Sequence, residues 1–386
     1  MTKKVSMLAV LVAVTVGIVW LAEMRNGFFD SKVYYGAIRF WFREGGMVYD
    51  WTRPGTPYGF TYPPFAGLTM APMAVLPFGA VVVIATAATV LTTVLVVGWL
   101  ILPLVRRRGW PVWFALGVAG CLAIAFEPVR ETITFGQVNT LLLALVAGDL
   151  LFGVGRGRRW AGAGIGLATA VKLTPGVFIL YLLVTRRWRA AFTAMAAAAG
   201  ATLATAAIFP DQSWRFWTSA LWDPGRVGDY WYLSNQSLRG FVARLPFDGV
   251  ESYLWIAGAG VLLVIWYRRV RARADDLVLG LALTGVLGCL LSPITWVHHC
   301  VWLLPALIRC AEAGLTWPGR RGYLFLAGAA YLVMTSRLTW LWENTPRLPL
   351  ALLGSNLYVY FSLALLIWTP ASRAGDRQDC VGAGRS

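Results

Sequence analysis

Long apolar stretches alternate with short polar segments along almost the whole chain. A helix needs roughly 20 apolar residues to cross a bilayer, and fewer where protein surrounds it. The pattern therefore predicts an all-α polytopic membrane protein, a bundle of about ten to twelve transmembrane helices. The stretches lie at about 5–22, 79–104, 111–126, 138–154, 161–185, 190–209, 252–267, 277–293, 298–311, 322–341 and 350–369.

Basic side chains come as short runs between these stretches. Such runs mark cytoplasmic loops under the positive-inside rule. With the first run inside, alternation of the spans puts the loops at about 23–64 and 210–251 outside, and makes 370–386 a cytoplasmic tail. The first apolar stretch resembles a signal peptide, but no small-residue cleavage site follows, which favours a retained helix. The sequence predicts one multi-pass domain over 1–386 in the cell membrane. The runs are 3–4, 106–108, 156–159, 186–189, 268–273 and 320–321.

Two segments depart from simple spans. Residues 161–185 lie between two basic runs, and their middle, VKLTPG, holds a lysine, a proline and a glycine that interrupt a helix. This favours a short helical pair with KLTP at the apex, pointing outward. The YPPF sequence at 62–65 places prolines at a helix start, which predicts an interfacial or re-entrant segment over 65–77.

Composition narrows the function classes. Hydrophobic residues make up 58% of the chain and charged residues 13%, which excludes a soluble protein of this size. The net charge of +16 suggests nucleic acid, but the basic residues are confined to short loops, so membrane lipids are the expected partners and nucleic acid is not. The five cysteines are scattered without a CxxC, and no nucleotide-phosphate loop occurs, so no metal and no cofactor are predicted.

Asp30 follows directly on the first apolar stretch. On a helix it heads a face that continues with Tyr34, Ala37 or Ile38, and Trp41. One interpretation is the N-cap of an amphipathic interfacial helix. The other is a general base, since a carboxylate among aromatic rings in a partly dry pocket can be tuned to accept a proton from an alcohol.

Lys172 lies in the middle of an apolar segment, where an ammonium group is costly. A structural role would be snorkelling to the interface or pairing with a carboxylate. A functional role would be the counter-ion of a phosphate at the membrane surface, with Thr174 and the interrupted helix adding donors. The position favours the functional role.

The segment FEPVRETITFGQVN combines charges and amides between two apolar stretches. Two interpretations are open for Glu127, Arg130 and Glu131: they lie in a solvated loop, or they bind a ligand. Gln137 and Asn139 open the next stretch, where amides cap a helix or hold sugar hydroxyls.

Two later motifs are also candidates. In YWYLSNQSLR, aromatic rings suit either stacking on sugars or an interfacial belt, while Asn235, Gln236 and Arg239 favour a carbohydrate ligand. His298 and His299 are adjacent, so their side chains diverge by about 100° on a helix and at most one is expected to face a site. The pair is a weak metal signature and suits phosphate binding or substrate orientation better.

All these polar motifs fall on the predicted outer side. No nucleotide sugar is present there, but a sugar carried on a lipid phosphate is available to a membrane enzyme. Such a transfer needs a base for the acceptor hydroxyl, cations for the departing phosphate, and amides and aromatic rings to orient the sugars. Alternatives of other classes are a transporter of lipid-linked sugar, which would show an inverted repeat or polar residues across the midplane, and a structural subunit.

Six motifs in this order resemble glycosyltransferase family 87, a group of GT-C-type membrane mannosyltransferases of actinobacteria. The resemblance extends from about residue 25 to 310. The motifs are FFDSKVYYGAIRFWFREGGMVYD, FTYPPFAGLTMAPMAVLP, GQVNTLLLALVAGDLL, GIGLATAVKLTPGVFILYLL, LSNQSLRG and SPITWVHHCVWLLP.

The resemblance implies transfer of mannose from polyprenyl-phosphate-mannose to a glycolipid acceptor of the phosphatidylinositol mannoside or lipomannan type, α-1,2-linked, on the outer face of the membrane. It implies that Asp30 is the essential acidic residue of the first external loop, and that His298, His299 and Lys172 fall on family motifs. A β-linked donor attacked from the opposite face would give an α product by a single inverting displacement with one base. A pentose such as arabinose on the same lipid is the alternative donor sugar. The predicted substrate-binding residues are Tyr62, Arg130, Gln137, Asn139, Lys172, Asn235, Gln236, Arg239, His298 and His299.

Overall fold

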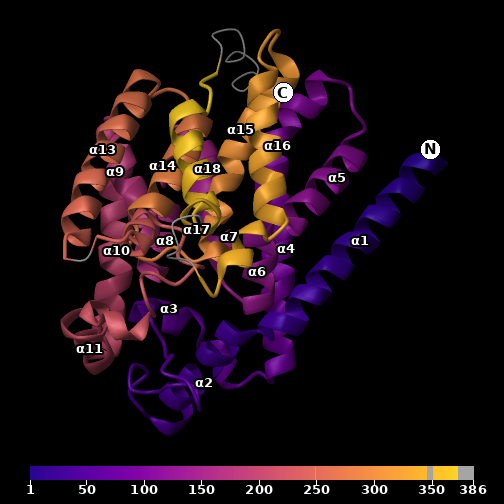
Figure 1. Cartoon of the computed structure of the whole chain (residues 1–386). Coiled ribbons are helices and arrows are strands. Elements are labelled where there is room, and N and C mark those ends of the chain that lie inside the picture. The colour runs from indigo at the N-terminus through magenta and orange to yellow at the C-terminus, as the bar shows by residue number, and fades with distance from the viewer. Residues whose placement is uncertain (248, 346–350, 373–386) are drawn as a thin grey trace. The chain divides into compact units, whose positions relative to one another are not determined.

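The computed structural model describes residues 1–247, 249–345 and 351–372, and its ordered elements in these ranges are helices (Figure 1). One isolated antiparallel bridge joins Thr52 to Gly59. The predicted cytoplasmic tail lies outside the described residues from 373 onward. The all-α fold predicted from the apolar pattern is confirmed.

Within the described ranges, four helices are long and apolar enough to cross a membrane: α1 (Thr2–Asn26), α4 (Phe78–Arg107), α10 (Trp188–Ile208) and α13 (Glu251–Ala272). A fifth span results if α5 (Val112–Ala125) and α6 (Glu127–Phe135), which meet at a bend of 70°, count together. Shorter apolar helices occupy Asn139–Val154, Thr174–Val184, Leu277–Leu291 and Leu357–Trp368. The chain is therefore a multi-pass membrane protein, and the number of ten to twelve spans stays a prediction.

The chain divides into two compact units. Unit 1 consists of Met1–Leu21, Leu91–Arg130 and Tyr230–Ser386, and unit 2 of Ala22–Val90 and Glu131–Asp229. In unit 1, α14 (Leu277–Leu291) is buried along most of its length because α13, α15 (Leu304–Thr316) and α18 (Leu357–Trp368) pack against it. The remaining helices of unit 1 are α12 (Leu238–Arg244), α16 (Arg321–Thr335) and α17 (Ala351–Ser355).

Unit 2 is organised around α2 (Phe29–Glu44). The predicted face is confirmed, since Tyr34, Ala37, Ile38 and Trp41 are all buried. The N-cap is Phe28, in a left-handed conformation, so the interpretation of Asp30 as the N-cap is wrong: the carboxylate lies one residue inside the helix. The apolar face of α2 packs into a core that also contains Val48, Tyr49, Phe60, Tyr62, Ala66, Met70 and Phe216.

The sequence after YPPF forms a short helix, α3 (Pro64–Thr69), and a 3-10 turn over Ala71–Ala74. Pro64 stands in the first turn of α3, where its missing N–H costs nothing. Unit 2 also contains α7 (Asn139–Gly148) and α11 (Pro210–Thr218).

The segment around KLTP forms the predicted helical pair. α8 (Ala163–Val171) ends at Lys172, whose backbone is extended, and a 3-10 turn at Thr174–Gly176 leads into α9 (Val177–Val184). Both helices pack against α10 (Figure 1). The Arg189 guanidinium donates to the carbonyls of Gly157 and Arg158, at 2.9 Å each. The two flanking basic runs therefore meet at one end of the pair, as predicted.

One prediction of local structure is wrong. The charged segment EPVRETITF forms a helix, α6. It is not a solvated loop, since the side chains of Glu127, Arg130 and Glu131 are only 0%, 4% and 2% exposed. Its charges are buried against hydrogen-bonding partners from distant parts of the chain, which no local pattern in the segment indicates.

Candidate active site

Asp30 and Gln137 form the centre of the candidate site in unit 2. The side-chain amide of Gln137 donates from Nε2 to Asp30 Oδ2 at 2.6 Å. The other carboxylate oxygen, Oδ1, makes no hydrogen bond to the described residues, and Asp30 is only partly buried. One oxygen is therefore fixed in place while the other is left to receive a proton.

Two tyrosines complete the hydrogen-bond network of Gln137. Its Nε2 also donates to Tyr34 Oη at 2.8 Å, and its Oε1 accepts from Tyr62 Oη at 2.6 Å. Tyr34 in turn donates to Tyr62 at 3.3 Å. Burial raises the pKa of Tyr62 well above its ordinary value, so the phenol stays protonated and acts as a donor. These bonds determine which way the Gln137 amide faces: its NH2 group points to the carboxylate.

The surroundings of Asp30 make it a stronger base than a solvated aspartate. Burial raises the pKa of Asp30 to about 6, against the lowering effects of the Gln137 hydrogen bond and of the positive charges of Lys172 and Arg53. At neutral pH a group with this pKa is still mostly ionised, and it accepts a proton more readily than an ordinary carboxylate.

Lys172 lies at the break between α8 and the following turn and reaches the same network. Its ammonium donates to Asn139 Oδ1 at 3.0 Å and to Tyr62 Oη at 3.5 Å, and it lies 5.2 Å from the Tyr62 ring centroid. The break in the helix therefore places the Lys172 ammonium, which follows an apolar helix, against the Asn139 amide and the Tyr62 phenol near Asp30.

The backbone around Gly136 brings α2 and the Gln137 segment together. Gly136 has a φ of +75°, and an added Cβ would lie 1.8 Å from Ser31 Oγ. Ser31 Oγ donates to the Gly136 carbonyl at 3.3 Å, and the Phe28 N–H donates to the Thr134 carbonyl at 2.8 Å. Only glycine fits this contact, and the contact places Gln137 against Asp30.

Unit 2 thus brings together five of the predicted residues: Asp30, Tyr62, Gln137, Asn139 and Lys172. Gln137 and Asn139 do not cap α7, whose N-cap is Val138 without a side-chain bond. The other predicted residues, Arg130, Asn235, Gln236, Arg239, His298 and His299, belong to unit 1.

In unit 1, Asn235 joins two loops through its side chain. Its Oδ1 accepts the Thr295 N–H at 2.9 Å, while its Nδ2 donates to the carbonyls of Tyr230 and Pro293 at 3.0 and 3.1 Å. Its amide is therefore engaged with backbone groups of the SPIT segment.

Gln236 lies beside it and is 1% exposed. Its Nε2 donates to the carbonyls of Leu233 and Ser355 at 2.7 and 2.8 Å. Its Oε1 is buried without a hydrogen-bond partner among the described residues. Arg239 lies near the surface, where it donates to Ser252 and lies over the rings of Tyr230 and Trp255.

The two histidines lie on a 3-10 helix, Val297–Leu303, and differ in surroundings. His298 is 5% exposed, whereas His299 is half-buried and its Nδ1 accepts the Trp296 N–H at 3.2 Å. The rings stand at 88° with centroids 4.6 Å apart. The two rings therefore lie in edge-to-face contact, and the expectation that at most one of them faces a site stays a prediction.

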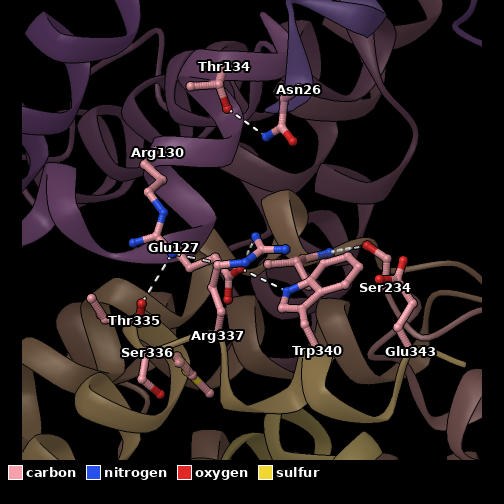
Figure 2. A network of polar contacts seen from close by, with 12 residues as sticks. Asn26, Glu127, Arg130, Thr134, Ser234, Thr335, Ser336, Arg337, Trp340 and Glu343 are labelled. Carbon is pink, nitrogen blue, oxygen red and sulfur yellow. Dashed lines mark hydrogen bonds and ion pairs between the residues drawn. The ribbon is translucent and has the colours of Figure 1, made fainter. Parts of the chain in front are cut away.

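Arg130 lies in a polar network of unit 1 (Figure 2). Its guanidinium donates to the carbonyls of Ala125 at 3.0 Å and Thr335 at 3.1 Å. Nearby, Glu127 accepts from Arg337 at 2.6 Å and from the Trp340 indole at 2.9 Å on one oxygen (Figure 2), and from Tyr358 at 2.6 Å on the other. These bonds hold the start of α6 to the C-terminal helices.

Sequence reasoning missed three polar residues that organise the fold. Asp149 accepts the N–H groups of Gly162 and Ile165 at 2.8 and 2.9 Å and thereby closes the start of α8. Arg244, fully buried, donates to Asn356 Oδ1 from two nitrogens. Asp149 had a usable signal, an acid inside an apolar stretch. The third residue is Arg53, and the sequence around it gave no signal of a special role beyond the Pro-Gly turn that follows it.

Comparison with known proteins places the chain in a family. The model of glycosyltransferase family 87 matches residues 60–293. A protein of Mycobacterium tuberculosis named polyprenol-phosphate-mannose-dependent alpha-(1-2)-phosphatidylinositol mannoside mannosyltransferase is 34% identical over 79% of this chain and 74% of its own length. A protein of Mycolicibacterium smegmatis with the corresponding pentamannoside mannosyltransferase name is 34% identical over 97% of this chain and 93% of its own length.

A second protein of Mycolicibacterium smegmatis, which carries the phosphatidylinositol mannoside mannosyltransferase name, is 31% identical over 88% of this chain and 82% of its own length. No solved structure matches the chain significantly. The resemblance read from the six motifs is confirmed by matches that cover most of the chain, and the protein belongs to glycosyltransferase family 87.

Proposed function

We propose that the protein is an α-mannosyltransferase that moves mannose from polyprenyl-phosphate-mannose to a hydroxyl of a phosphatidylinositol mannoside-type acceptor. The observation that carries the proposal is the arrangement of Asp30, held by Gln137, beside Lys172 in a chain of this family. The names of the relatives support this donor, this acceptor class and an α-(1-2) linkage over a pentose donor or a transporter.

Asp30 acts as the general base. Its Oδ1 takes the proton of the acceptor hydroxyl as the oxygen attacks C1 of the donor mannose. The bond between C1 and the phosphate oxygen breaks on the opposite face, and the lipid phosphate departs with the electron pair. A β-linked donor then gives an α product in one inverting displacement, which needs one carboxylate and not two.

Lys172 and Tyr62 supply positive charge and a hydrogen-bond donor near the base. The Lys172 ammonium donates to Asn139 Oδ1 and to Tyr62 Oη, which holds the positive charge in place beside the base. Arg130, Asn235, Gln236, Arg239, His298 and His299 remain proposed substrate-binding residues of unit 1.

The reaction takes place on the extracytoplasmic side of the cell membrane. This follows from the positive-inside arrangement of the basic runs, which puts Asp30 in the first external loop. A donor with a long polyprenyl tail reaches such a site from within the bilayer.

The test is transfer by the purified protein in lipid, with labelled polyprenyl-phosphate-mannose and phosphatidylinositol mannosides, followed by identification of the product glycan. Asp30→Asn should lower transfer about 100- to 10,000-fold, because general-base catalysis is lost while the shape of the side chain is kept.

Asp50→Asn is the matched control, since Asp50 lies in the same loop but pairs with Arg215 at the surface, at 3.0 Å. It should transfer mannose like the unchanged protein. Full activity of Asp30→Asn would exclude Asp30 as the base, and failure with every mannosylated inositol lipid would exclude the acceptor class.

A further inference from the structure

Arg53 lies on a tightly closed turn in the loop after α2. Its N–H donates to the Tyr58 carbonyl at 2.8 Å, and its own carbonyl accepts from the Thr56 N–H at 3.0 Å. The bridge between Thr52 and Gly59 closes the turn. The backbone of Arg53 is therefore fixed by several hydrogen bonds, which is unusual for a basic residue in a polar loop.

The side chain of Arg53 is fixed as well. Its guanidinium carbon lies 4.3 Å from the centroid of the Phe29 ring, and the Tyr58 ring packs edge-on against Phe29 at 5.8 Å. Phe29 is the first residue of α2 and directly precedes Asp30. Stacking on the aromatic face orients the planar guanidinium beside the start of α2, next to the proposed base.

Arg53 has unused hydrogen-bonding capacity. Its Nη1 is buried and has no hydrogen-bond partner in the described part of the chain, and Arg53 forms no ion pair there. Lys172, by contrast, already donates to Asn139 and Tyr62. A buried N–H of a charged group without an acceptor is unfavourable, and an anionic oxygen at this place would satisfy it.

We propose that Arg53 binds the phosphodiester of the lipid-linked sugar donor and holds the lipid phosphate as it leaves. The inference rests on the proposed function and names the cation of the donor subsite. A guanidinium suits this role because it offers two parallel N–H bonds to phosphate oxygens.

The charge balance of the site supports an anionic ligand. Both Arg53 and Lys172 act electrostatically on Asp30, so two cations face one carboxylate before substrate binds. The donor phosphodiester carries one negative charge, and the departing lipid phosphate carries two. Two cations at the site therefore stabilise the leaving group more than the bound donor.

Arg53→Gln is the first test, with donor titrated at saturating acceptor. Loss of a charge-assisted hydrogen bond should raise KM for polyprenyl-phosphate-mannose about tenfold to a hundredfold. Arg53→Lys keeps the charge but loses the planar guanidinium that stacks on Phe29. Its KM for the donor should lie between those of the unchanged protein and Arg53→Gln. Arg39→Gln is the matched control, because Arg39 also lies over an aromatic ring, that of Tyr35, which is on a later turn of α2 than Phe29. It should leave both Michaelis constants unchanged.

The acceptor also carries a phosphodiester, so it is titrated separately at saturating donor. A rise in the acceptor KM alone would overturn the proposal and assign Arg53 to the acceptor. Binding of polyprenyl phosphate is then measured directly, in the Asp30→Asn background, with melting temperature as the check on folding. The double variant with Arg53→Gln should bind this lipid about tenfold to a hundredfold more weakly.

Equal binding by the single and double variants would overturn the role of Arg53 without affecting Asp30. Undiminished transfer by Asp30→Asn alone would refute the proposed base, whatever Arg53 does. The two failures are therefore distinguishable.

Discussion

Asp30 illustrates how one carboxylate becomes suited to a reaction. Its Oδ2 is held by an amide whose own orientation is fixed by Tyr62, which is buried. The two nearby cations oppose the rise in pKa that burial causes, and the result is a pKa of about 6. The Asp30 carboxylate is thus a stronger base than a solvated aspartate, yet it is mostly ionised at neutral pH.

The pH dependence of transfer follows from this balance. A general base works only when deprotonated, so kcat/KM, which reports the pKa values of the free enzyme, should fall as the pH drops through about 6, and not only near 4 as for an ordinary aspartate. Gln137→Leu removes a donor to the ionised form, which raises the pKa of Asp30 further. The acid limb of the kcat/KM profile should then move to higher pH, on the order of one pH unit.

Ser31→Ala is the control for this shift. Ser31 neighbours Asp30, but its hydroxyl donates to the Gly136 carbonyl and does not touch the carboxylate. The variant should lose some stability and keep the acid limb in place. An unmoved acid limb in Gln137→Leu would contradict the assignment of Gln137 as the residue that positions the base.

At this scale the sequence pointed to several residues that the structure brings together, and it missed the contacts between them. Asp30 and Lys172 stood out because charge is costly at apolar positions. The roles of Gln137 and Arg53 depend on the orientation of an amide and a guanidinium. Their partners lie elsewhere in the chain, as with Gln137 and Asp30, 107 residues apart, and no local pattern encodes such contacts.

Among the elements, α2 and the turn before α7 depend on each other. The two segments touch at Gly136, where the positive φ and the short distance to Ser31 both exclude a side chain. The amphipathic face of α2 was predictable from helical spacing. This contact was not, since a single Gly in a polar segment is also typical of an ordinary turn.

Gly136→Ala should therefore lower both stability and transfer. A left-handed backbone costs a non-glycine residue about 1–2 kcal/mol, and the clash with Ser31 adds about 1–3 kcal/mol. Gly157→Ala tests the first cost alone, because Gly157 has a φ of +61° and open space around its Cα.

Melting temperature and transfer are measured for both variants. The Gly157 variant should melt slightly lower and remain active, whereas the Gly136 variant should melt clearly lower and lose activity. Equal melting temperatures would show that the contact with Ser31 is unimportant.

For the whole molecule, the arrangement of basic runs predicts how the chain crosses the membrane. The hydrogen bonds of Arg189 to the carbonyls of Gly157 and Arg158 hold two runs together. We therefore predict that the helical pair between them returns to the side of the membrane from which it started, and that a strict alternation of spans fails there.

Accessibility of introduced cysteines tests this topology. Arg158→Cys and Trp188→Cys should both react with a membrane-impermeant maleimide only from the cytoplasmic side, and Pro57→Cys only from outside. Cys121, Cys289, Cys300 and Cys310 are buried, so replacing Cys380 suffices as background. Labelling of positions 158 and 188 from opposite sides would make the helical pair a simple span.

The network of Glu127 bears on how far this enzyme can be shortened. The family match stops at residue 293, yet this buried carboxylate accepts its hydrogen bonds from Arg337, Trp340 and Tyr358, and Arg337 is also nearer to it than its other ion-pair partner, Arg130. A protein truncated to the recognisable family segment would keep a negative charge in its interior and lose every one of these donors. We therefore expect the segment that supplies these donors, which lies beyond the family match, to be required for the folded enzyme.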